Sequence, residues 1–236
     1  MEEKSVEKEI KKDFKSKLID ILIIIVIVLV GLFMYAKYLE PKTLVIKETR
    51  LVENEIPLSY SGVKLVFFSD LLLGSSVTID ELDNVVNKIK ELKPDILIYG
   101  GNLIYKETDD KEKVISLLSG IETSIGKYYV TGLLDKDKSI EILDKSGFTK
   151  LDNNYELLYY KDVTPICLYG VSSYILGNYK LEDMSNCKGY YTIFISHEPD
   201  VVNKLSNEEA NLVLSGNTLG GEVNLPLLSK KYDGST

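Results

Sequence analysis

Histidine is almost absent from this chain of 236 residues, and the only one is His197. Catalytic mechanisms that rely on several imidazole ligands around zinc or a pair of metal ions are therefore excluded. Tryptophan is absent, and 28 basic side chains are outnumbered by 36 acidic ones, which gives a net charge of −8. Because binding to a phosphate backbone requires a basic face, this composition argues against a nucleic-acid partner.

Cysteine is scarce as well. The two cysteines, Cys167 and Cys187, lie 20 positions apart and form no C-x-x-C pair. We interpret them as two small buried hydrophobic side chains. A disulfide between them would require that the domain be exported to an oxidising compartment.

Long hydrophobic runs are limited to one, residues 18–36, which carries a single charge at Asp20. Its 19 residues are enough for a helix that crosses a bilayer, and no A-x-A-like cleavage site of a signal peptide follows. The preceding tail, residues 1–17, carries six lysines. This bias favours a single-pass membrane protein with a cytoplasmic N-terminus and an extracytoplasmic domain at 43–236.

The pattern after residue 43 predicts an α/β fold. The first elements expected are strands 43–52 and 63–69, a helix from Thr78, strand 96–99, helix 110–118, strand 128–130 and helix 138–146. This alternation predicts a sheet with parallel pairing, and Thr78–Glu81 has the form of a capping box. The later elements expected are strands 155–160, 165–171, 191–195 and 212–214, short helical pieces 180–184 and 199–205, and a loop-like tail from Gly220.

Polar residues follow several of the apolar runs. The resulting motifs are S-D-L-L-L-G at 69–74, G-G-N-L at 100–103, T-G-L-L-D at 131–135, S-H-E-P-D at 196–200 and S-G-N-T-L-G-G at 215–221. Polar groups at the carboxyl ends of buried α/β strands are where ligands commonly bind. These motifs therefore mark the candidate site.

In order and spacing, the motifs resemble the calcineurin-like metallophosphoesterase superfamily, and above all its membrane-anchored bacterial branch. The signature of that family is D-x-H, G-D, G-N-H-D, a lone H and G-H-x-H. The resemblance implies two packed mixed sheets flanked by helices (αββα), two divalent metal ions such as Mn, Fe or Zn, and hydrolysis of phosphoesters. Because the family continues into further strands, the domain is also expected to be truncated at its C-terminus.

Most of the family's ligand positions are substituted in this chain. Among seven positions, only Asp70 and His197 keep the family residue, and Asp135 keeps the last residue of G-N-H-D. The substituted metal-ligand positions are Leu72, Asn102, Leu133, Asn217 and Leu219, and Leu134 occupies the position of the family's general acid. Leucine offers no lone pair, and the neutral amide of Asn102 cannot offset two cations as a bridging carboxylate does. We therefore expect no metal cofactor and no catalytic residue.

The remaining polar residues have structural interpretations. Asp70 is expected to cap a turn, His197 to bond to a carbonyl group at the start of a helix, and Asp135 to hold a loop. In the family's geometry the substituted leucines, 72, 133, 134 and 219, would converge and fill the former metal site as an apolar floor.

Three functions follow from these observations. The first is a membrane-anchored pseudoenzyme with a binding or regulatory role. The second is a residual phosphoester hydrolase with one metal ion at Asp70, Asn102, His197 and Asn217. The third is a module that binds a lipid or another envelope component through the leucine-lined former active site, with the lipid or protein partner unidentified.

Overall fold

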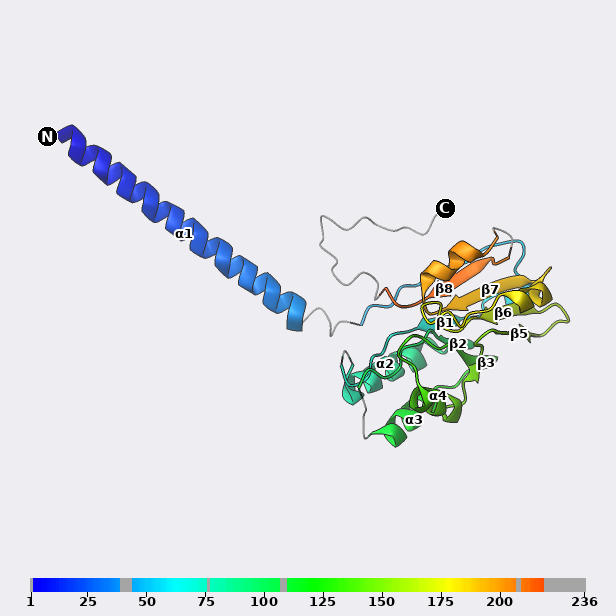
Figure 1. Ribbon diagram of the computed structural model, residues 1–236. Helices are drawn as coiled ribbons and strands as arrows, with labels where there is room; N and C mark the ends of the chain where they lie inside the picture. The colour runs from blue at the N-terminus through cyan, green and yellow to red at the C-terminus, as the bar shows by residue number, and fades with distance from the viewer. Residues whose placement is uncertain (1, 39–43, 76, 107–109, 207–208, 219–236) are drawn as a thin grey trace. The chain divides into compact units, whose positions relative to one another are not determined.

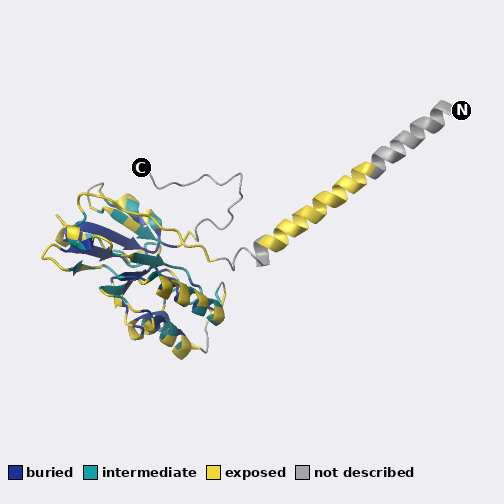
Figure 2. Ribbon diagram, turned by 180° about the vertical axis from the view of Figure 1, so that it is seen from behind, coloured by how far each residue is buried: buried dark blue, intermediate teal, exposed yellow. Residues whose placement is uncertain are grey.

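The computed structural model describes residues 2–38, 44–75, 77–106, 110–206 and 209–218 (Figure 1). The chain divides into two compact units, Met1–Arg50 and Leu51–Thr236. The first unit contains helix α1 (Glu2–Tyr38), and its stretch Lys17–Tyr35 is long and apolar enough to cross a membrane. Figure 2 shows this stretch exposed on all sides, as expected for a helix whose apolar surface is covered by lipid.

The second unit contains two four-stranded sheets within the described residues. The first is parallel in the order β1 (Leu65–Phe68), β2 (Ile96–Tyr99), β3 (Gly126–Tyr129) and β4 (Thr149–Lys150). The second has the order β5 (Asn154–Leu158), β6 (Ile166–Gly170), β7 (Tyr191–Ser196) and β8 (Leu212–Ser215), with only β5 antiparallel to its neighbour. The helical elements are α2 (Ile79–Leu92), α3 (Lys111–Ser119), α4 (Asp137–Lys145) and the 3-10 helices η2 (Leu58–Tyr60), η3 (Glu182–Cys187) and η4 (Pro199–Lys204).

Side-chain alternation along the strands creates the layers of this unit. On β2, Ile96 and Ile98 pack into the cluster between the two sheets, whereas Leu97 and Tyr99 pack against the helices of the first sheet. On β6 and β7, every second residue likewise faces the first sheet, and the others pack with η3 and η4. The predicted arrangement of two packed sheets flanked by helices is therefore confirmed, and strands β2, β6 and β7 are buried along their whole length (Figure 2).

Helix α2 begins where the sequence predicts. The hydroxyl of Thr78 accepts a hydrogen bond from the backbone N–H of Glu81 at 3.3 Å, and the Glu81 carboxylate accepts from the backbone N–H of Thr78 at 2.8 Å. This capping box satisfies two donors that the first helical turn leaves free. The helix ends at Leu92 and is followed by Lys93 with a φ of +52°.

Several predicted elements are corrected by the structure. Residues 44–52 form no strand, and their apolar side chains are exposed. The pieces expected at 180–184 and 199–205 are 3-10 helices, which are common in segments too short for stable α-helix. Strand β4 was not predicted, because two residues are too few to establish a period. The tail from Gly220 lies outside the described residues, so the expected truncation stays a prediction.

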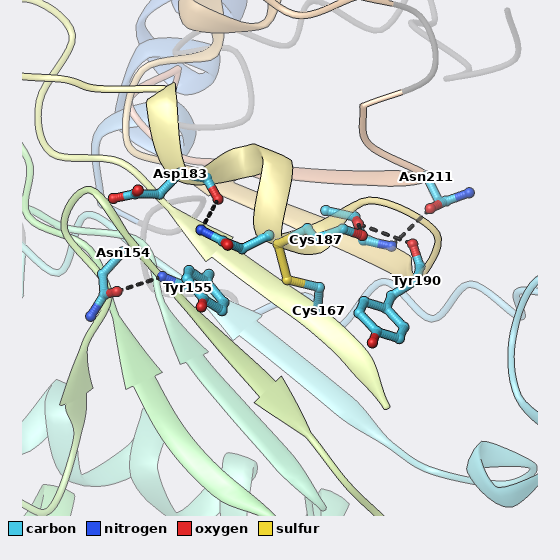
Figure 3. The surroundings of a disulfide bond; sticks show 9 residues. Asn154, Tyr155, Cys167, Asp183, Cys187, Tyr190 and Asn211 are labelled. Carbon is cyan, nitrogen blue, oxygen red and sulfur yellow. Dashed lines mark hydrogen bonds between the residues drawn. A yellow bond between two sulfur atoms is a disulfide. The ribbon is translucent and has the colours of Figure 1, made fainter. Parts of the chain in front are cut away.

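The expectation that the two cysteines are separate thiols is wrong. Cys167 on β6 and Cys187 in η3 form a disulfide, with their Cα atoms 5.5 Å apart (Figure 3). Both residues are buried in the cluster that joins the second sheet to η3 and η4. A spacing of 20 residues carries no information on this contact, which depends on η3 folding back onto the outer face of β6.

Candidate functional site

The loops after the parallel strands place four of the expected residues at one edge of the two sheets. Asp70 follows β1, Asn102 follows β2, His197 follows β7 and Asn217 follows β8. Hydrogen bonds connect them across both sheets, so these four residues are named the candidate site. This convergence at the carboxyl ends of parallel strands is the arrangement in which α/β proteins commonly bind ligands.

His197 is fully buried and has a hydrogen-bond partner at each ring nitrogen. Its Nδ1 lies 2.6 Å from the carbonyl oxygen of Gly100. Because a carbonyl only accepts, Nδ1 carries the proton, and Nε2 of the neutral ring is left as an acceptor. Nε2 lies 2.7 Å from Nδ2 of Asn102, which only donates. The predicted bond between His197 and a carbonyl group is therefore present, although it connects the two sheets rather than starting a helix.

The amide of Asn102 is fixed in orientation by its surroundings. Its Oδ1 accepts from the backbone N–H of Leu134 at 3.0 Å, so Nδ2 faces the other way. Nδ2 then donates to Oδ1 of Asp70 at 3.1 Å and to Nε2 of His197. One neutral amide therefore satisfies acceptor atoms on both family residues that the chain retains.

The Asp70 carboxylate is also satisfied from within the protein. Its Oδ2 accepts from the Ser69 hydroxyl at 2.7 Å and from the backbone N–H of Asn217 at 2.8 Å. Its Oδ1, besides receiving the Asn102 amide, lies 3.6 Å from Nε2 of His197. Asn217 thus contributes its backbone to the site, and Ser69 is a participant that the sequence reasoning missed.

Asp135 holds the loop backbone, as its structural interpretation predicts. Its carboxylate accepts from the N–H groups of Asn102 at 2.6 Å, Leu103 at 2.9 Å and Gly132 at 2.9 Å. These bonds link the loop after β2 to the loop after β3. Bonds from a carboxylate to backbone N–H groups are charge-assisted and roughly twice as strong as neutral ones.

At least one of the substituted leucines takes no part in the expected apolar floor. Leu133 is 40% exposed, and neither it nor the half-buried Leu72 and Leu134 belongs to the hydrophobic clusters of the described residues. Leu219 lies outside the described residues. The prediction that these side chains fill the site is therefore wrong for Leu133, since the centre is occupied by the amide network of Asn102.

The backbone at the site is strained. Asp70, Leu72, Asn102 and Asn217 all have positive φ values, between 46° and 66°. Asn and Asp tolerate this left-handed conformation better than other residues, whereas a leucine there is uncommon. Such strain persists where surrounding bonds enforce it, and it is frequent at functional sites.

The donor atoms present do not fit the family's two metal ions. No group of three or more His, Cys, Asp or Glu side chains that could hold a metal ion occurs among the residues described. More specifically, the Asn102 amide directs N–H groups at the lone pairs of Asp70 and His197 that a cation would need. A cation at this position would face amide hydrogens instead of a bridging carboxylate.

Several known proteins are similar to this chain in sequence. No family model matches the chain. An uncharacterised metallophosphoesterase of Bacillus subtilis (strain 168), YkuE, is 32% identical over 83% of this chain and 72% of its own length. A Danio rerio protein described as a transmembrane protein with metallophosphoesterase domain is 25% identical over 75% of this chain, but over only 45% of its own length. The UDP-2,3-diacylglucosamine pyrophosphatase LpxG of Chlamydia muridarum is 24% identical over 82% of this chain and 74% of its own length.

The similarity to the Bacillus protein covers most of both chains, and the chain belongs to the metallophosphoesterase family. The predicted family is therefore confirmed. The apolar helix α1, together with a relative named as a transmembrane protein, supports association with a membrane. The crystal structure of the protein TT1561 from Thermus thermophilus matches 64% of this chain with a TM-score of 0.47 and 14% identity, a likeness too low to support an inference.

Proposed function

We propose that this chain is a membrane-anchored member of the metallophosphoesterase family that does not cleave phosphoesters and whose folded unit serves in binding or regulation. The observation that carries the proposal is the position of the Asn102 amide, which donates to both Asp70 and His197. Hydrolysis in this family depends on metal ions, and the amide occupies the donor atoms that would hold them.

The chemistry that remains at the site supports this proposal. Metal-assisted hydrolysis needs a metal-bound hydroxide at neutral pH and a proton donor for the leaving group. The neutral His197 has both ring nitrogens in hydrogen bonds, and the position of the family's general acid is Leu134. In the one-metal alternative Asn102 would ligate through Oδ1, yet this atom already accepts from the backbone N–H of Leu134, and Nδ2 of the same amide donates to Asp70.

The proposed topology places the folded unit outside the cytoplasm. Six lysines precede the apolar segment, and a cytoplasmic N-terminus is the orientation that this bias favours. The disulfide between Cys167 and Cys187 supports the same orientation, because disulfides persist in oxidising compartments.

Metal analysis of the full chain tests the proposal. The protein is expressed in medium supplemented with Mn, Fe and Zn, purified in detergent, and assayed for metal content and for turnover of an aryl phosphodiester. We expect substoichiometric metal and no turnover above that of a heat-denatured sample. One or more equivalents of metal together with turnover would overturn the proposal and favour the hydrolase. Asn102→Ala serves as the matched variant, since any true metal-dependent activity at this site should change with it.

A further inference from the structure

The loop after β6 presents two large apolar side chains to solvent. The backbone N–H of Gly177 donates to the carbonyl oxygen of Tyr174 at 3.0 Å, which closes a turn with Ile175 and Leu176 at its two central positions. These side chains are 56% and 52% exposed. Central turn positions are typically occupied by Gly, Asn, Asp, Pro or Ser. Two adjacent aliphatic residues there are not explained by the requirements of the turn or by packing in the core.

The turn is held by buried polar contacts. Glu198 is 1% exposed, and its carboxylate accepts from the Ser173 hydroxyl at 2.7 Å and from the backbone N–H of Tyr174 at 2.8 Å. On the far side of the turn, Nδ2 of Asn153 donates to the carbonyl oxygen of Asn178 at 2.8 Å. The two aliphatic side chains are thus displayed on a supported loop, with little conformational entropy left to lose on binding.

The turn belongs to the same edge of the sheets as the candidate site. Glu198, which anchors it, directly follows His197, and β6 runs parallel to β7. Two further apolar side chains are exposed on loops that follow strands of the first sheet, Tyr105 after β2 and Leu133 after β3, at 54% and 40%. Exposed apolar residues mark surfaces that contact a protein or a membrane where they adjoin one another, as Ile175 and Leu176 do at the turn.

We propose that the tip formed by Ile175 and Leu176 inserts into the bilayer that anchors α1. The argument for this occupant is the tether: residues 39–50 connect α1 to the folded unit, and twelve residues span at most about 40 Å. The membrane surface therefore stays within reach at a high effective concentration, so a weak apolar contact is sufficient for binding. This contact depends on the loop after β6 alone and does not rest on the absence of metal at the site.

The lack of tryptophan in the chain provides a direct test. The full-length variant Leu176→Trp is reconstituted in phosphatidylcholine liposomes, with and without lipids brominated on the acyl chain. The matched control is Val163→Trp, at a position that is 84% exposed and lies in the connection between β5 and β6, at the opposite end of β6. Bromine quenches an indole only when the indole lies within the bilayer. We expect blue-shifted emission and about twofold quenching for Leu176→Trp, and neither for the control.

A second variant separates insertion from simple proximity. Adding Ile175→Asp to Leu176→Trp should abolish the quenching, because a carboxylate at the neighbouring tip position opposes entry into the bilayer. Both side chains are exposed, so circular dichroism and the melting temperature should stay unchanged. Three results would each overturn the proposal and leave a protein partner as the occupant: equal quenching of the two tryptophan variants, quenching that survives Ile175→Asp, or emission from Leu176→Trp as red-shifted as that of the control.

Discussion

The Nδ2 atom of Asn102 lies 2.7 Å from Nε2 of His197. In this arrangement the imidazole accepts a hydrogen bond with the lone pair that a metal-ligating histidine uses to bind its ion. The same Nδ2 atom also donates to Asp70. The site is therefore held together by hydrogen bonds from a neutral group, at the position where the family places a bridging carboxylate.

Replacing this amide by a carboxylate should destabilise the site and create a need for a cation. In Asn102→Asp the new carboxylate would face Oδ1 of Asp70 across about the 3.1 Å of the present hydrogen bond, and both N–H donors would be lost. We expect a loss of roughly 2 kcal/mol or more in the free energy of unfolding, partly recovered when Mn²⁺ is added. Urea unfolding of the full chain with and without Mn²⁺ measures both effects.

The exposed Asn203 provides the matched control for the added charge, and Asn203→Asp should unfold like the unaltered protein. Stabilisation of the unaltered protein by Mn²⁺, to the same extent as Asn102→Asp, would contradict the interpretation of the site.

Asp135 should matter for stability. In Asp135→Asn, one oxygen would replace the two that now accept from Asn102, Leu103 and Gly132, and the new NH₂ group would face N–H donors. We expect a loss of about 2–3 kcal/mol, as for other hydrogen bonds to a charged group. Urea unfolding is the measurement, and Asp162→Asn in the exposed β5–β6 connection, where an amide oxygen can still accept from Val163, should have little effect. Equal losses in both variants would argue against a specific role of Asp135.

Reduction of the disulfide should weaken the second sheet. The bond joins Cys167 to Cys187 across a sequence separation of 20 residues, for which chain entropy predicts a contribution of about 3 kcal/mol. Thermal unfolding with and without dithiothreitol tests this. The double variant Cys167→Ala with Cys187→Ala should unfold at the same temperature in either condition. The prediction would be refuted if the unaltered protein had the same melting temperature with and without dithiothreitol although free thiols were detected after reduction.

Strongly alkaline solution should unfold the protein through its buried tyrosines. Burial raises the pKa of Tyr128 and of Tyr169 to about 12, and burial likewise raises the pKa of Tyr99 well above 10. Above pH 10 the unfolded chain loses phenolic protons that the folded chain retains, so the unfolded state binds fewer protons and the free energy of unfolding falls as pH rises. The stabilisation that the protonated tyrosines give to the folded state is fully present below pH 10 and is lost between pH 10 and 12.

Tyrosinate absorbance near 295 nm gives the matching readout, undisturbed because the chain has no tryptophan. We expect part of the 16 tyrosines to ionise only together with the loss of far-ultraviolet circular dichroism. Titration of all tyrosines before any unfolding would contradict the burial described above.

The sequence predicts the elements that carry a local signal, in both halves of the domain. Helix α2 is marked locally by Thr78 and Glu81, strand β2 by an uninterrupted apolar run and strand β7 by a mostly apolar one. The disulfide and the turn at Ile175 depend instead on tertiary contacts of η3 and of Glu198, which no local period encodes. At the candidate site, the motifs identified the residues that meet, but not that the Asn102 amide connects them. Leucine substitutions suggested an apolar interior, although Leu133 is exposed.

Two glycines beside His197 have a consequence for how such chains are recognised. A Cβ atom at Gly101 would lie 2.9 Å from Nδ1 of His197, and one at Gly132 would lie 2.7 Å from Cδ2 of the same ring. The ring is thus confined between two stretches of bare main chain, and any larger residue would push the loops apart. Glycine at positions 101 and 132 is thus required by the steric fit around the ring, so a genome survey that reads these two glycines as signs of phosphatase chemistry would be reading a packing requirement.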